Sequence, residues 1–184
     1  MRRYADGDDE AFLALYQGLA PRLKIFLRRL CGQVELAEDL TQETMLRIHR
    51  ARGSFARHAA VVPWALAIAR NCHIDHLRAV RARIKVAHPT EGETAMVEPV
   101  AGLESSAEER QIARQTAERI ERELDRMTIA RREAFVLLRY EGLSVSEAAQ
   151  VLGATPSAVK LRAFHAYEAI RRALANDAEQ EELP

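Results

Sequence analysis

The sequence is poor in cysteine and contains no long apolar run. Its 184 residues include two cysteines, Cys31 and Cys72, which are too few for a disulfide framework and are typical of a protein in a reducing cytosol. No apolar run approaches the roughly 18 residues of a transmembrane helix. The first residues, MRRYADGDDEAF, reach acidic residues at once and contain no apolar signal-peptide core. The sequence therefore predicts a cytoplasmic protein without a signal peptide or a membrane span.

Motifs of common catalytic sites are missing as well. The sequence contains no glycine-rich phosphate loop, no GxSxG and no HExxH. A cysteine with any of the histidines could form a nucleophile pair, but nothing in the sequence positions them. Cys72 and His76, with His73 between them, have a helical spacing that can bind zinc, although a further ligand would have to come from elsewhere. We predict a protein that is not an enzyme and has no catalytic residue, cofactor or metal; metal analysis of the purified protein tests the zinc alternative.

No sign of charge is in excess over the whole chain, because 27 Lys and Arg balance 27 Asp and Glu. The charges are nevertheless segregated. The basic and acidic residues number 15 and 9 in residues 1–88, 4 and 10 in residues 89–125, and 8 and 4 in residues 126–174. Attraction to phosphate acts over a Debye length of roughly 8–10 Å. Two basic blocks with an acidic block between them are therefore compatible with nucleic-acid binding.

Apolar residues recur at helical spacing in the first half of the chain, and no stretch alternates long enough to predict a β-strand. We predict helices over residues 10–30, 36–52 and 63–85. Gly32 and Gly53 are expected to end the first two, and Pro63 suits the first turn of the third. Trp64 has two interpretations, a core residue and a platform on which a base stacks; we favour the core.

Residues 86–108 have a different composition, with proline, glycine, serine and glutamate and no helical stripe. This segment is predicted to be a flexible linker. Ser106 and Glu109 have the spacing of a capping box for the next helix. Helical patterning resumes from residue 108 to 127 and again from 129 to 141.

The stretch EGLSVSEAAQVLGATPSAVKLRAFHAYEAIRRAL predicts a helix, a tight turn and a second helix. Ser144 and Glu147 have capping-box spacing, Gly153 supplies the turn, Thr155 can cap the second helix, and Pro156 suits its first position. A helix-turn-helix presents the N-terminal part of its second helix to the DNA major groove. The outward positions there are Ser157, Lys160, Leu161 and Arg162. The alternative interpretation is an ordinary helical hairpin with a solvated face.

Three stretches of the sequence resemble the extracytoplasmic-function sigma factors, the smallest class of bacterial sigma factors. They are GDDEAFLALYQGLAPRLKIFLRRLCGQVELAEDLTQETMLRIHRAR, PWALAIARNCHIDHLRAVRAR and RREAFVLLRYEGLSVSEAAQVLGATPSAVKLRAFHAYEAIRRAL. Together they cover nearly the whole chain except the linker and the acidic tail, in the family's order. The resemblance implies polymerase docking by the first stretch, melting and reading of the −10 promoter element by the second, and reading of the −35 element by the third.

The resemblance assigns polymerase binding to AEDLTQETMLR. Within it, Asp39, Gln42, Glu43 and Leu46 are spaced i, i+3, i+4 and i+7, so they share one helix face. Two carboxylates, an amide and an exposed apolar residue suit docking on a basic coiled coil of the polymerase. Without the resemblance, this strip would be interpreted as a solvated acidic face.

For the −10 element, the resemblance implies phosphate contacts from the third helix and a pocket for a flipped base in the loop before it. The candidate residues are Arg52, Phe55, Arg57, Arg70, Asn71, Asp75, Arg78 and Arg81. For the −35 element they are Ser157, Lys160, Leu161, Arg162 and His165. Leu161, Phe164 and Tyr167 depart from the polar residues frequent in the family, which leaves the −35 preference open; a thymine methyl group would suit Leu161.

We therefore predict an all-α fold of two small helical domains joined by a flexible linker, the second containing the helix-turn-helix. Domain boundaries are expected at 1–88 for docking and −10 recognition, 89–108 for the acidic linker, 109–178 for −35 recognition and 179–184 for an acidic tail. The expected partners are core RNA polymerase, promoter DNA and an anti-sigma factor. The alternative is a conventional helix-turn-helix regulator with an N-terminal helical interaction domain.

Overall fold

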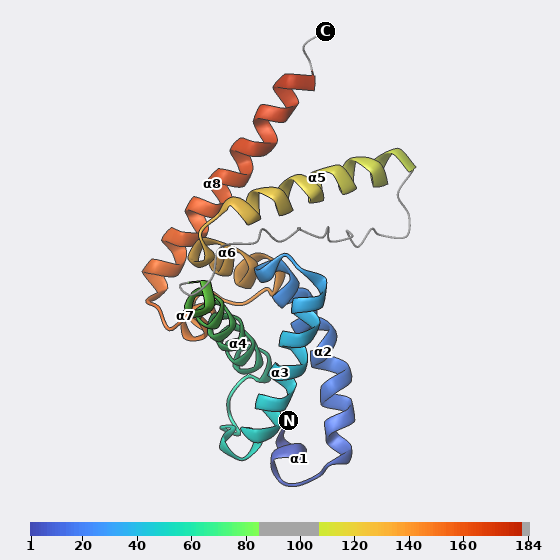
Figure 1. Ribbon diagram of the computed structural model, residues 1–184, viewed down its shortest axis with the longest axis vertical. Coiled ribbons are helices and arrows are strands. Elements are labelled where there is room, and N and C mark those ends of the chain that lie inside the picture. The colour runs from blue at the N-terminus through green and yellow to red at the C-terminus, as the bar shows by residue number, and fades with distance from the viewer. Residues whose placement is uncertain (85–106, 182–184) are drawn as a thin grey trace.

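The computed structural model describes residues 1–84 and 107–181, and this part of the chain is helical and contains no β-strand (Figure 1). The elements in the N-terminal half are α1 (Arg2–Ala5), α2 (Glu10–Cys31), α3 (Val34–Arg50), the short 3₁₀ turn η1 (Arg52–Ser54) and α4 (Val61–Ile84). Those in the C-terminal half are α5 (Ala107–Arg126), α6 (Ile129–Phe135), the π-helical turn η2 (Val136–Tyr140), α7 (Val145–Leu152) and α8 (Pro156–Glu181). The predicted all-α class is confirmed.

Helices α2, α3 and α4 pack against one another in the N-terminal half (Figure 1). Their apolar stripes meet in a core of Leu19, Leu23, Phe26, Leu27, Leu30, Ala37, Leu40, Met45, Ile48, Ala65, Leu66 and Ala69. Gly32 ends α2 with φ +72°, a left-handed conformation that glycine adopts without a Cβ penalty. Helix α4 begins at Val61, two residues before Pro63, so the proline lies in its first turn, where its missing N–H costs nothing.

In the C-terminal half, α8 packs against α5, α6 and α7. Leu124, Phe135, Ala166 and Ile170 form a small core between α5, α6 and α8. The predicted capping box of α7 is present, because the Ser144 hydroxyl accepts from the Glu147 N–H and the Glu147 carboxylate accepts from the Ser144 N–H. Gly153 makes the turn with φ +58°, and the Thr155 hydroxyl caps α8 by accepting from the Ala158 N–H. These local signals place α7 and α8 in the helix-turn-helix arrangement.

The two halves are in contact, mainly where α7 lies against α4 and where α6 approaches α2 (Figure 1). One apolar cluster includes residues from both halves, such as Leu66 of α4 and Val151 of α7. Arginine contacts also cross the boundary: Arg22 Nε donates to Glu141 Oε2 (2.6 Å), Arg70 Nε to Glu133 Oε1 (2.9 Å) and Arg132 Nη1 to the backbone oxygen of Leu30 (2.9 Å). The two halves therefore form one closed body in this structure.

Some predicted features fall outside the described residues. These are the part of the predicted linker (residues 89–108) that ends at residue 106, the cap expected at Ser106, and the last three residues of the acidic tail. Helix α5 begins at Ala107, so the last two residues of the predicted linker are helical. Helix α8 runs into the predicted tail as far as Glu181. None of the helices in the described ranges is long and apolar enough to cross a membrane. The domain boundaries at residues 88 and 109 remain predictions.

Candidate nucleic-acid and polymerase interfaces

The outer face of α3 carries the residues predicted to bind polymerase. Asp39, Gln42 and Leu46 are exposed, with Leu46 at 51 %. They stand opposite the buried stripe of α3, which includes Leu40, Thr44 and Ile48. The helix therefore presents polar groups and one large apolar side chain on a surface that the fold leaves uncovered.

Glu43 lies at the edge of this face and forms an ion pair within the protein. Its Oε1 is 2.7 Å from Nε of Arg47, whose Nη1 is 2.7 Å from Oδ2 of Asp75 on α4. These hydrogen bonds to Asp75 and Glu43 raise the pKa of the Arg47 guanidinium, which therefore stays charged. The Arg47–Asp75 pair thus helps to hold α3 against α4, and Glu43 binds the same guanidinium within α3, in addition to the binding roles predicted for Glu43 and Asp75.

A groove between α2 and α3 adjoins the α3 face, and Gln42 is the one residue of its lining that was predicted as a site residue. Tyr16, Pro21, Gln42 and Glu38 are among the residues that line it. Tyr16 is 43 % exposed, and Leu13, one turn earlier on α2, is 62 % exposed. The signal in the sequence was their i, i+3 spacing on the side of α2 that the core does not use.

On α4, the candidates for the −10 element divide between two faces. Asn71, Asp75 and Arg78 are exposed and spaced i, i+4, i+7, so they form one polar strip. Arg81 is also exposed. Arg70 instead faces α6, where it is paired with Glu133 and only 19 % of its side chain is exposed. In the closed arrangement Arg70 is therefore engaged in the boundary between the halves.

In the loop before α4, Arg52 is half-buried, and Arg57 is exposed and paired with Asp6. Phe55 is buried, and its ring packs edge-on against Trp64 with the centroids 5.0 Å apart. Trp64 packs against the apolar core, the interpretation that the sequence favoured. The Phe55 ring therefore lies inside the fold in this arrangement, and its role in a base pocket remains a prediction.

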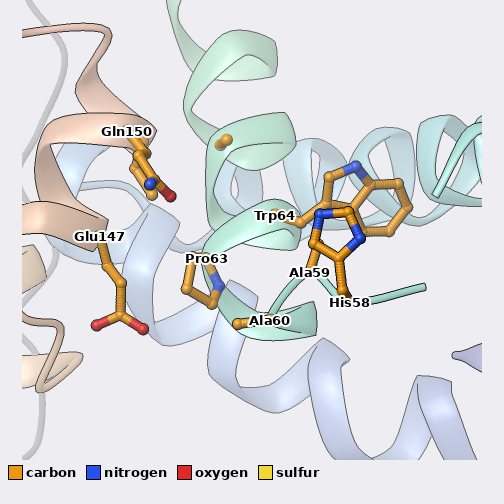
Figure 2. A pocket seen from close by; sticks show the side chains of 9 residues that line it. His58, Ala59, Ala60, Pro63, Trp64, Glu147 and Gln150 are labelled. Carbon is orange, nitrogen blue, oxygen red and sulfur yellow. The ribbon is translucent and has the colours of Figure 1, made fainter. Parts of the chain in front are cut away.

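A cavity of about 480 Å³ lies between the start of α4 and α7. Figure 2 shows His58 and Trp64 on the α4 side and Glu147 and Gln150 on the α7 side. Pro63 lies between them at the first turn of α4 (Figure 2). The cavity is therefore a product of the closed arrangement of the two halves.

The outward face of α8 carries most of the residues predicted for the −35 element. Ser157, Lys160, Leu161 and His165 are exposed, and Val159 and Ala163 are buried on the opposite side. Arg162 lies at the flank and is half-buried. Its positive charge is among those that favour the ionised form of Glu133, although burial dominates and raises the pKa of that carboxyl group.

Cys72, His73 and His76 lie on α4 as predicted, but the first two face inward. Cys72 and His73 are each 2 % exposed. Burial raises the pKa of the Cys72 thiol, which disfavours the thiolate that a nucleophile or a metal ligand needs. Across residues 1–84 and 107–181, no three His, Cys, Asp or Glu side chains gather in a group that could hold a metal ion.

Two family models match the chain, each over one of its halves. The model described as Sigma-70 region 2 matches residues 15–83, which include α3 and all of α4 except its last residue. The model described as Sigma-70, region 4, matches residues 117–170, which include the helix-turn-helix. The two halves of the chain therefore match two regions of the sigma-70 family, in the order region 2 and then region 4.

Curated relatives extend over the same region. The chain is 33 % identical to RNA polymerase sigma factor CarQ of Myxococcus xanthus, over 95 % of each protein. It is also 33 % identical to the extracytoplasmic-function sigma factor SigM of Mycobacterium tuberculosis, over 91 % of this chain and 79 % of SigM. The chain belongs to the sigma-70 family of RNA polymerase sigma factors, in its extracytoplasmic-function group.

A solved structure has the same fold. This structure is the sigma factor RpoE in complex with the anti-sigma factor NepR from Bartonella quintana. RpoE is 22 % identical to this chain, the match covers 90 % of this chain and 98 % of RpoE, and the TM-score is 0.77. CnrH in complex with the cytosolic domain of CnrY is also similar, with 22 % identity over 96 % of this chain and 95 % of CnrH and a TM-score of 0.66. These likenesses support the all-α architecture.

Proposed function

We propose that this sigma factor docks on core RNA polymerase through the outer face of α3, holds the −10 element along α4 and reads the −35 element with α8. The α3 face would supply Asp39, Gln42, Glu43 and Leu46. The α4 strip of Asn71, Asp75 and Arg78, together with Arg81 and the loop arginines, would hold the separated strand. The polymerase performs the chemistry, so the chain itself is not an enzyme, and its place of action is the cytoplasm.

The observation that carries this proposal is the outward face of α8. The capping box at Ser144, the left-handed Gly153 and the Thr155 cap set α7 and α8 at a tight turn. The first turns of α8 then expose Ser157, Lys160 and Leu161, which is where a helix-turn-helix meets base edges and phosphates.

The experiment mixes the purified full chain with core polymerase on a library of promoter sequences. A sigma factor directs initiation from a defined subset of the library with no other factor present. The conventional regulator, which is the second candidate function, gives no specific transcripts unless another sigma factor is added. Initiation no greater than with core polymerase alone would contradict the proposal.

We further propose that an anti-sigma protein holds the chain inactive until a signal arrives. The similar sigma factor RpoE forms a complex with the anti-sigma factor NepR, and the similar protein CnrH forms a complex with the cytosolic domain of CnrY. The exposed surfaces for polymerase and DNA are the natural ones for such a partner to cover. Copurification from the native cell without stress should give a complex with a third protein; recovery of only free chain or polymerase complex would contradict this expectation.

A further inference from the structure

Two large apolar side chains stand side by side on the outward face of α8. Leu161 is 57 % exposed and Phe164 is 58 % exposed. They are spaced i, i+3, so they are neighbours on the helix surface. Ser157 lies one turn before Leu161 on the same face. The pair therefore occupies the middle of the surface that the helix-turn-helix presents.

Packing within the protein does not account for this pair. The inward residues of α8, Val159, Ala163 and Ala166, are buried. Tyr167 is also partly exposed, but its ring packs edge-on against Phe135 with the centroids 4.9 Å apart. The Phe164 ring, in contrast, contacts the ring of its neighbour His165, with the centroids 5.7 Å apart, and His165 is itself exposed.

The charges around the pair favour DNA as the occupant of this surface. Lys160 and His165 flank the two apolar side chains, and the acidic residue closest along α8 is Glu168, beyond the outward residues of the first turns. A lysine beside the pair can hold a phosphate while the helix lies in the major groove. A hydrophobic protein partner would not require this basic flank.

The major groove offers one strongly apolar feature, the C5 methyl group of thymine. We propose that Leu161 and Phe164 read thymine methyl groups in the −35 element and so determine its sequence preference. This inference rests on the proposed function, because it takes α8 as the −35 reading helix. Lys160 then supplies affinity that does not depend on the methyl groups.

The test replaces thymine with uracil, which removes the methyl group and leaves the base-pairing edge unchanged. The full chain with core polymerase first selects binders from promoter duplexes with a randomised −35 segment. The selected duplex is then remade with uracil at each thymine of that segment. We expect wild-type holoenzyme to bind about fourfold more weakly for each methyl group that is read, the fold-change equivalent to about 0.8 kcal/mol for one buried carbon group.

Variants assign the effect to the apolar pair. Leu161→Ala and Phe164→Ala should each reduce the ratio of thymine to uracil affinities toward one. Lys160→Ala is the matched control, because it should weaken both duplexes alike and leave the ratio unchanged. Both apolar positions are exposed, so circular dichroism should show a native helix content in each variant.

The remaining outcomes separate the inference from the function on which it rests. The inference is wrong if the selected −35 duplex binds equally well with thymine and with uracil. It is also wrong if both apolar variants keep the wild-type ratio of thymine to uracil affinities. Neither result contradicts the sigma-factor function. If the variants instead weaken binding to a copurified protein and keep the ratio, the pair is a protein-docking surface and the inference is wrong. A holoenzyme that selects no sequence and initiates nowhere contradicts the proposed function and the inference together.

Discussion

His73 lies near the boundary between the two halves, where its side chain is 2 % exposed. Burial, followed by the positive charges of His76, Arg132 and Arg70, lowers its pKa to about 4. No hydrogen-bond partner for Nδ1 lies among the described residues. His73 is therefore neutral in the folded protein at neutral pH, and charging it is costly.

The depressed pKa of His73 predicts acid sensitivity. A histidine that titrates near 6.5 when unfolded and near 4 when folded supports the fold above pH 6.5 and loses that contribution as the pH falls toward 4. Between pH 7 and pH 5 the loss should be about 2 kcal/mol. Urea unfolding of the wild type and of His73→Leu at both pH values measures it.

The leucine variant should lose less stability than the wild type over this interval. His58→Gln, at an exposed position, is the matched control and should follow the wild type. The carboxyl groups of the half-buried Glu121 and the buried Glu133, whose pKa values desolvation raises, titrate in both proteins and cancel in the comparison. An identical pH dependence in the leucine variant would contradict this account of His73.

At the scale of single elements, the short helix α7 depends on its cap. Eight residues form few internal hydrogen bonds, so the reciprocal bonds between Ser144 and Glu147 satisfy a large share of its free N–H groups. Ser144→Ala should lower the free energy of unfolding by about 1 kcal/mol. Ser146→Ala, two residues later on an exposed position of α7, should have a much smaller effect in the same urea titration.

A second prediction at this scale concerns the outer face of α3. Changing Asp39 and Gln42 to Ala, with Glu43→Ala added, should weaken association with core polymerase and leave the helix content near that of the wild type. The comparison between the double and the triple variant matters, because Glu43 also pairs with Arg47. If both variants bind core polymerase as tightly as the wild type in a pull-down, this face is not part of the docking site.

The sequence predicted the helices and the helix-turn-helix because their signals are local. Gly32, the Ser144–Glu147 pair and Pro156 mark helix ends through their own backbone and hydrogen-bonding chemistry. The packing of α7 on α4 could not be predicted in this way. A helical stripe shows that a face is apolar but does not show which partner covers it.

The same limit applies to the candidate site. Arg70 was placed with the surface arginines because of its residue type, yet in the closed arrangement it is paired with Glu133. Leu161 was found because an outward position in a recognition helix is defined by spacing alone. Tyr16 was missed because the groove that it lines requires both α2 and α3 to be in place.

At the scale of the whole molecule, the closed arrangement has to open for the proposed function. Reading two promoter elements more than one helical turn apart requires α4 and α8 to lie at least roughly 34 Å from each other along the DNA. Here α7, the helix before α8, instead packs against α4, and Arg29 also lies over the Tyr140 ring at 3.7 Å across the boundary. A protein that must open to bind has its apparent affinity reduced by the fraction of molecules that are open.

Arg22 provides the means to test this opening. Its Nε donates to the Glu141 carboxylate at 2.6 Å and its Nη2 to the Glu141 backbone oxygen at 2.7 Å. The Glu141 side chain is 4 % exposed, so removing Arg22 leaves a buried carboxylate without this partner and destabilises the closed state. Arg22→Gln should therefore open the two halves.

The open population should be measurable in two ways. Small-angle X-ray scattering should give a larger radius of gyration for Arg22→Gln, and the apparent affinity for core polymerase should rise by about tenfold for each 1.4 kcal/mol that the closed contact loses. Arg126→Ala removes an exposed arginine that pairs with the half-buried Glu123 within α5, and it is the matched control.

If Arg22→Gln keeps both the wild-type dimensions and the wild-type polymerase affinity, with native helix content, the boundary between the halves does not restrain binding. A larger radius without any gain in affinity would show that the halves open but that opening does not limit polymerase association, because the affinity gain follows only if the closed state competes with the polymerase-bound one.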